Sequence, residues 1–217
     1  MATLHYVYDP YCGWCYAAAP LLAVASALPG LSLELHGGGM LAGTRRRLVT
    51  PQWREQVMPH DRRIAQLSGQ PFGAAYFDGL LREEGALFDS APPTIAIRAA
   101  QFMGGRGAAM LGQLQRAHFV LGRRISDPAV LRDLAAGLGL EARGFDSASQ
   151  AYAGAAIEQH FRASARLLAQ AGGQGFPTFV LEDRGVLTRI GHADCIGQPD
   201  AWLRLLGERL GDAALSA

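Results

Sequence analysis

The feature that most constrains the fold is a Cys-x-x-Cys motif that stands between a short strand and a helix. Leu4–Tyr8 is aromatic and β-branched, which predicts a strand. The motif Cys12-Gly13-Trp14-Cys15 comes next, and residues 17–28 that follow it are rich in helix formers. Leu31–Leu35 alternates apolar and polar residues, which predicts a second strand. The three elements form a βαβ unit, whose strands run parallel and are joined by a right-handed crossover.

The rest of the chain divides into a helical block and a second part with strands. Residues 50–149 carry only helical patterns, and 151–171 predicts another long helix. Strand patterns return at 178–181 and 186–190, and the Asp-Arg-Gly turn between them predicts an antiparallel hairpin. The segment 199–210 is expected to form a final amphipathic helix.

Composition narrows the class of protein. The 217 residues are 49% hydrophobic and 18% charged, which allows one sizeable core or one domain with an insertion. A net charge of +1 predicts neither a nucleic-acid partner nor an anionic membrane surface. The longest apolar stretch, 16–28, is too short to span a bilayer and lacks the basic start of a secretory signal. Three cysteines without an export signal predict a cytoplasmic protein that uses paired thiols for catalysis or metal binding.

The position of the paired cysteines favours redox chemistry. A thiol at the first turn of a helix faces unpaired backbone N–H groups and the positive end of the helix dipole, which favours its thiolate. Two cysteines three positions apart can close a disulfide and reopen it, the first attacking and the second resolving the mixed disulfide. Zinc sites use the same spacing, so the motif alone leaves metal binding open.

A second motif, Gly175-Phe176-Pro177-Thr178-Phe179-Val180, places a proline directly before a strand, where a cis peptide bond can occur. Together with Cys12-Gly13-Trp14-Cys15 and Pro20 inside the following helix, it resembles the thioredoxin superfamily. The helical block makes the chain similar to the DsbA-like oxidoreductases, in their FrnE-like, protein-disulfide-isomerase-like branch. The resemblance implies an α/β, thioredoxin-like fold with a central mixed β-sheet of four strands. An inserted all-helical domain would cover the active-site edge.

The resemblance also implies a division of the chain and a set of roles. Residues 1–45 and 150–217 would form the two halves of the thioredoxin-like domain, and 46–149 the insertion. Cys12 would be the nucleophile, Cys15 the resolving thiol and Pro177 a cis-proline. We expect substrate contacts at Gly13, Trp14, Phe176, Thr178 and His192, with Trp14, Phe176 and Tyr11 as an apolar rim around Cys12.

The expected reaction is thiol–disulfide exchange on disulfide-containing proteins or small thiols, by a monomer or a homodimer. No metal or organic cofactor is expected, although glutathione is a candidate co-substrate. An alternative is a glutathione-dependent enzyme similar to the kappa-class transferases and the 2-hydroxychromene-2-carboxylate isomerases. Those enzymes use Ser where this chain has Cys12, and they do not need Cys15.

A lesser alternative joins Cys12, Cys15, His192 and Cys195 in a zinc-binding module. Otherwise Cys195 is expected to be a partly buried thiol without a role. The remaining histidines, His5, His36, His60, His118 and His160, are scattered with no pair at ligand spacing, which predicts surface or core positions. Arg45-Arg46-Arg47 is expected to be a solvated loop.

Overall fold

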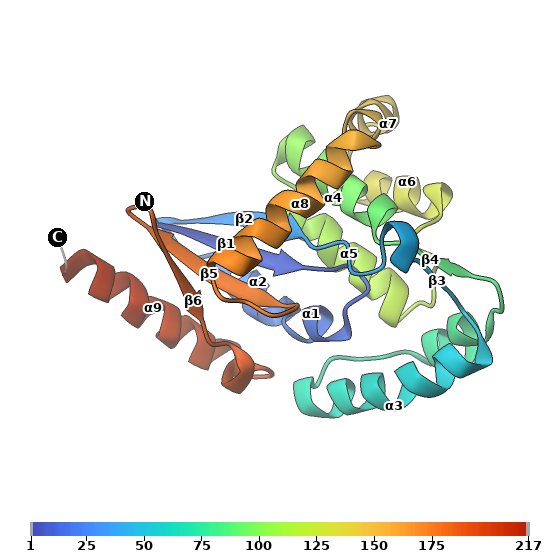
Figure 1. Ribbon diagram of the computed structural model, residues 1–217, viewed down its shortest axis with the longest axis horizontal. Helices are drawn as coiled ribbons and strands as arrows, with labels where there is room; N and C mark the ends of the chain where they lie inside the picture. Colours follow the sequence, from blue (N-terminus) through green and yellow to red (C-terminus); the bar gives the residue numbers. More distant parts are fainter. Residues whose placement is uncertain (1, 216–217) are drawn as a thin grey trace.

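A mixed four-stranded sheet forms the centre of the computed structural model, which describes residues 2–215 (Figure 1). The strand order is β2-β1-β5-β6. β1 pairs parallel with β2 and antiparallel with β5, and β5 pairs antiparallel with β6. The four strands are β1 (Ala2–Tyr8), β2 (Leu31–Gly37), β5 (Thr178–Asp183) and β6 (Val186–Ile190). The expected α/β, thioredoxin-like sheet is therefore confirmed.

Different helices cover the two faces of the sheet. On one face lie α1 (Gly13–Ala17), α2 (Ala19–Ser26) and α9 (Pro199–Leu215), which pack on the buried side chains of β1 and β5. On this face, the Tyr6 hydroxyl donates a hydrogen bond to the Cys15 carbonyl at 3.1 Å. The long helix α8 (Ala155–Gln170) crosses the other face, close to β2 (Figure 1).

The helix that follows the Cys-x-x-Cys motif is split in two. α1 begins at Gly13 and ends at Ala17, and Pro20 lies in the first turn of α2. A proline inside one continuous helix would remove a backbone hydrogen bond and clash with the preceding turn, whereas the first turn tolerates it. Pro20, expected inside one helix, thus lies just after a break between two helices.

The insertion is mostly helical and reaches the active-site edge. Both α3 and α5 contact α1, and the rings of Tyr16 and Phe119 stack with their centroids 5.0 Å apart. These contacts fix the motif helix between the two parts of the chain. The helices are α3 (Pro51–Ser68), α4 (Ala91–Gly104), α5 (Gly107–Phe119), α6 (Pro128–Gly137) and α7 (Ala142–Ala151), with a π turn at Ala75–Gly79 and a 3-10 turn at Leu80–Arg82. Another 3-10 turn, Gly43–Arg45, precedes the insertion.

Two sequence predictions need correction in this region. The block is not helical only, because β3 (Arg47–Leu48) and β4 (Leu87–Phe88) pair antiparallel, and two-residue strands leave no periodic pattern in the sequence. The helix predicted over 151–171 is shorter, because Ala151 ends α7 and Gly154, with φ +60°, precedes α8. Within residues 2–215, no helix is both long and apolar enough to cross a membrane.

Candidate active site

Cys12 is the N-cap of α1, at the end of the loop that leaves β1. Its Sγ accepts a hydrogen bond from the Cys15 backbone N–H at 3.3 Å. Its thiol donates to the Phe176 carbonyl oxygen at 3.6 Å. A thiolate formed at this position keeps the N–H contact at the start of the helix, which stabilises its negative charge.

Cys15 lies deeper than Cys12 and is chemically different from it. The Cys15 side chain is fully buried, and its Sγ accepts a hydrogen bond from the Asp9 backbone N–H at 3.5 Å. Burial raises the pKa of the Cys15 thiol well above its usual value, and the hydrogen bond to Cys12 and the charge of Cys12 raise it further. Both cysteines are free thiols. The arrangement suits Cys12 for attack on the substrate disulfide. Cys15 stays protonated until it resolves the mixed disulfide.

The proline loop lies directly against these thiols. The Phe176–Pro177 peptide bond is cis, which confirms the prediction for Pro177. The Phe176 ring packs on the backbone of Gly38, where an added Cβ would lie 2.0 Å from the ring. Thr178 is buried at the start of β5, and its hydroxyl donates to the Gly175 carbonyl at 2.8 Å. Thr178 therefore stabilises the backbone of the proline loop through this hydrogen bond.

A cavity of about 670 Å³ lies between Trp14 of the motif and the cis-proline loop, and it gathers several of the expected substrate-binding side chains. Trp14, Phe176, Pro177 and His192 all line it, together with Leu67 of α3. Burial lowers the pKa of His192, and the positive charge of Arg189 lowers it further, so the imidazole is neutral at pH 7. Trp14, Leu67 and Phe176 give the cavity an apolar wall beside the motif, and Asp194 adds a carboxyl group to its lining.

Gly13 and Tyr11 pack against other parts of the protein and do not line this cavity. A Cβ on Gly13 would lie 2.8 Å from Asp61 Oδ1 and from Ile64 Cδ1, so α3 packs directly on this glycine. Tyr11 is buried and stacks on Phe88 with ring centroids 5.0 Å apart. Tyr11 therefore belongs to the core, and its predicted place in the apolar rim is wrong.

The lesser zinc alternative has no geometric support. Within residues 2–215, Cys12, Cys15, His192 and Cys195 do not form a group whose ligand atoms lie within 4.8 Å of one another. Cys195 lies in a 3-10 turn, buried as expected, and burial raises the pKa of its thiol.

Two buried carboxyl groups beside the motif are not singled out by the sequence. Asp9 accepts hydrogen bonds from the N–H groups of Tyr11 at 3.0 Å and Met40 at 2.7 Å, and from the Ser90 hydroxyl at 2.9 Å. Burial raises the pKa of Asp9 to about 6. The one sequence signal for this residue is its position directly before the motif loop. Asp9 ties this loop to the segment after β2 and to the start of α4.

Asp61 is the second buried carboxyl group. It accepts a hydrogen bond from the Tyr76 hydroxyl at 2.7 Å, and burial raises its pKa to about 6. No sequence pattern distinguishes it from the other acidic residues of the helical block, because its burial depends on how α3 packs against α1.

Comparison with known proteins agrees with this geometry. A family model described as DSBA-like thioredoxin domain matches residues 3–194, whereas no curated protein matches the chain in sequence. The chain is similar to the cytosolic disulfide reductase DsbM from Pseudomonas aeruginosa, with 53% identity over 96% of this chain and 98% of that chain and a TM-score of 0.90. The structure of that reductase with GSH matches with the same identity and coverage and a TM-score of 0.89.

A 2-hydroxychromene-2-carboxylate isomerase is 15% identical over 97% of this chain and 98% of that chain, with a TM-score of 0.59. This likeness is one of fold alone. The family match, by contrast, includes both Cys12 and Cys15 and extends over the cis-proline loop. The chain belongs to the DSBA-like thioredoxin domain family and is a thiol–disulfide oxidoreductase that acts on thiol or disulfide substrates.

Proposed function

We propose that the protein is a cytoplasmic disulfide reductase whose oxidised form is reset by glutathione. The observation that carries the proposal is the contrast between the two thiols: Cys12 lies at the helix start against Phe176, and Cys15 is fully buried behind it. The similarity to a cytosolic reductase, whose structure was also determined with GSH, supports the compartment and the direction. A reducing compartment keeps such a pair as dithiol between turnovers.

In the proposed reaction, the Cys12 thiolate attacks one sulfur of the substrate disulfide. A Cys12–substrate disulfide forms, the substrate S–S bond breaks, and the released thiolate takes a proton. The Cys15 thiolate then attacks Cys12 Sγ, which closes the Cys12–Cys15 disulfide and releases the second substrate thiol. The substrate gains two electrons and the enzyme loses two. Two molecules of glutathione return them and leave as glutathione disulfide.

The raised pKa of Cys15 gives this scheme a pH dependence. Only the thiolate attacks, and at neutral pH the Cys15 thiolate is a small fraction of the total because burial disfavours it. We expect the resolving step to accelerate about tenfold per pH unit in this range. Single-turnover release of the second substrate thiol, measured between pH 6 and 8, tests this expectation.

A second cavity supports glutathione as the reductant. It has a volume of about 530 Å³, is lined by Arg45, Arg162 and Phe176, and lies on the Gly38 side of the proline loop. The Arg45 side chain is exposed, as expected, but its guanidinium donates to the Gly39 carbonyl at 2.8 Å, which holds it at this cavity. Two guanidinium groups suit the two carboxylates of glutathione. We expect Arg162→Gln to raise the KM for glutathione, with little effect when dithiothreitol is the reductant.

The decisive measurement is the reduction potential of the Cys12–Cys15 pair in glutathione buffers, followed by thiol-specific mass shifts. A potential of about −270 mV supports a reductase, whereas a potential of about −120 mV indicates an oxidant and overturns the proposed direction. In parallel, Cys12→Ser is expected to abolish turnover, and Cys15→Ser to accumulate the mixed disulfide. Full multiple turnover with glutathione by Cys15→Ser would instead favour the transferase or isomerase alternative.

A further inference from the structure

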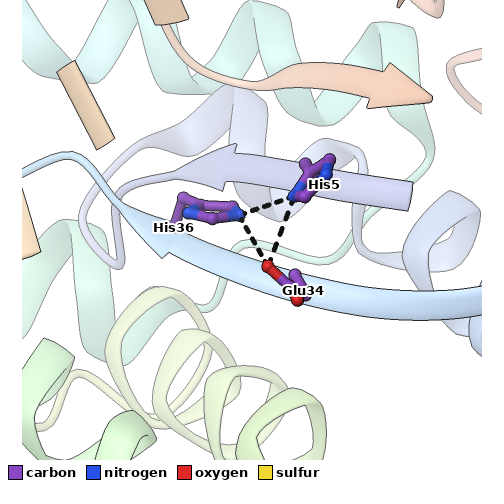
Figure 2. A group of neighbouring side chains, drawn as sticks. All are labelled: His5, Glu34 and His36. Atoms are coloured by element: carbon purple, nitrogen blue, oxygen red, sulfur yellow. Dashed lines mark hydrogen bonds and ion pairs between the residues drawn. The ribbon is translucent and has the colours of Figure 1, made fainter. Parts of the chain in front are cut away.

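Three side chains with metal-binding atoms converge on the face of the sheet away from α1. His5 lies on β1, and Glu34 and His36 lie on β2 (Figure 2). The strand register places His5 directly opposite Glu34, and His36 follows two residues later on the same face. Residues 31 positions apart in sequence thus become neighbours, which corrects the expectation that all these histidines are scattered.

The ligand atoms form a compact triangle. His5 Nδ1 lies 2.9 Å from His36 Nε2 and 3.5 Å from Glu34 Oε2, and the third side, from His36 Nε2 to Glu34 Oε2, is 3.7 Å (Figure 2). A tetrahedral zinc ion with bonds of 2.0–2.1 Å places its ligand atoms about 3.3 Å apart. The triangle therefore needs shifts of only a few tenths of an ångström to hold such an ion.

A fourth residue orients the cluster. Glu182 of β5 lies with Oε2 2.8 Å from Nε2 of His5. A carboxylate only accepts, so Nε2 of His5 carries the proton and its Nδ1 directs a lone pair toward His36 and Glu34. Metal-binding histidines almost always donate their second ring N–H to a carboxylate, a backbone carbonyl or water, and Glu182 is such a partner. Without metal, His36 Nε2–H donates to His5 Nδ1. A metal ion at the centre would take the place of that proton, and the neutral imidazole of His36 would then carry its proton on Nδ1.

The surroundings leave one coordination position accessible. His5 is buried, but the Glu34 side chain is 59% exposed and the His36 side chain 19%. Glu34 and His36 also line a cavity of about 470 Å³ between β2, α4 and α8. Three protein ligands with one open position are typical of zinc sites that bind water or a further ligand. Imidazole and carboxylate ligands together favour zinc over calcium or magnesium.

We propose that His5, Glu34 and His36 form a binding site for zinc or a similar divalent transition metal, oriented by Glu182 and separate from the redox site. In residues 2–215 they are the only group of three or more such side chains whose ligand atoms lie within 4.8 Å of one another. The inference does not depend on the proposed reductase function, because none of the four residues contacts Cys12 or Cys15.

The test uses full-length protein in which all three cysteines are replaced by serine, because free thiols bind zinc themselves. After treatment with EDTA, equilibrium dialysis against zinc chloride is expected to give one zinc ion per chain. Cobalt(II) should give the visible bands of a tetrahedral site without sulfur-to-metal charge transfer. In this background, His36→Ala and Glu34→Gln should each weaken binding at least about tenfold. Glu182→Gln should weaken it by about 10–100-fold through loss of orientation.

His160→Gln is the matched control. His160 lies on α8 near the cluster, but its Nε2 accepts a hydrogen bond from the Gly37 backbone N–H at 3.0 Å. A glutamine oxygen can accept the same bond, so zinc affinity should not change. The proposal is overturned if the cysteine-free protein keeps its circular dichroism spectrum and binds no zinc, or if His36→Ala binds zinc as tightly as its parent. It is also overturned if His160→Gln and His36→Ala lose equal affinity.

Discussion

The thiol of Cys12 donates to the carbonyl oxygen of Phe176 at 3.6 Å, although the two residues are 164 positions apart in sequence. This contact joins the start of α1 to the cis-proline loop, and so brings the nucleophile to the backbone that precedes β5. The position of Phe176 depends in turn on Gly38, which leaves room for its ring. The redox site is therefore assembled from both halves of the thioredoxin-like domain.

Gly38→Ala should reduce catalytic efficiency. The added Cβ would lie 2.0 Å from the Phe176 ring, so Phe176 must move away from its place beside Cys12. Displacement of a positioning group by about 1 Å can cost up to about 100-fold, and we expect kcat/KM for disulfide reduction to fall about 10–100-fold. Gly207→Ala, where nothing lies within 4 Å of the added Cβ, is the control. Equal activity of the two variants would contradict the role given to Phe176.

Gly13→Ala should destabilise the protein. Its Cβ would lie 2.8 Å from both Asp61 Oδ1 and Ile64 Cδ1, and Asp61 is held in place by Tyr76. We expect the free energy of unfolding in urea to fall by about 1–3 kcal/mol through overpacking. In Gly112→Ala, an open position inside α5, it should rise by about 0.5–1 kcal/mol. A neutral Gly13→Ala would show that α3 does not pack tightly on α1.

Tyr76→Phe should lower stability more at pH 8 than at pH 5. The pKa of Asp61 is raised from 3.8 to about 6, so its contribution to stability falls as the pH rises through this range and is constant above it. Loss of the Tyr76 hydroxyl raises the folded-state pKa further and extends the fall above pH 6. The expected cost at pH 8 is about 1–3 kcal/mol. In an Asp61→Asn background this pH dependence should disappear, which urea unfolding at both pH values can check.

His118→Phe should reduce the loss of stability in acid. His118 is fully buried among Tyr11, Tyr76 and Phe88, and burial lowers its pKa from 6.5 to about 3. Between these pH values the unfolded chain binds the proton and the folded chain does not. Stability therefore falls as the pH drops from 6.5 towards 3, by up to about 1.4 kcal/mol per pH unit for this residue.

In urea unfolding between pH 4 and 7, His118→Phe should remove that part of the slope. An unchanged slope in His118→Phe would show that other groups cause the acid sensitivity.

Local patterns were sufficient for the sheet and for the two redox motifs. The strands around 4–8, 31–35, 178–181 and 186–190 were all predicted, because alternation and turn residues act over a few positions. The cis bond at Pro177 was predicted as well, from its place before a strand and the resemblance to thioredoxins. The two-residue strands and the break between α7 and α8 are not predicted from the sequence. Such short segments contain too few residues to show a periodic pattern.

By itself, the sequence determined the order of the elements, the strand-to-helix position of Cys12 and Cys15, and the proline that begins β5. Only the tertiary structure decided that His5 and His36 touch, that Asp9 and Asp61 are buried beside the motif, and that Tyr11 lies in the core. The reason is physical. Secondary structure follows from neighbours within a few positions, whereas these contacts depend on strand register and helix packing between residues far apart in the chain.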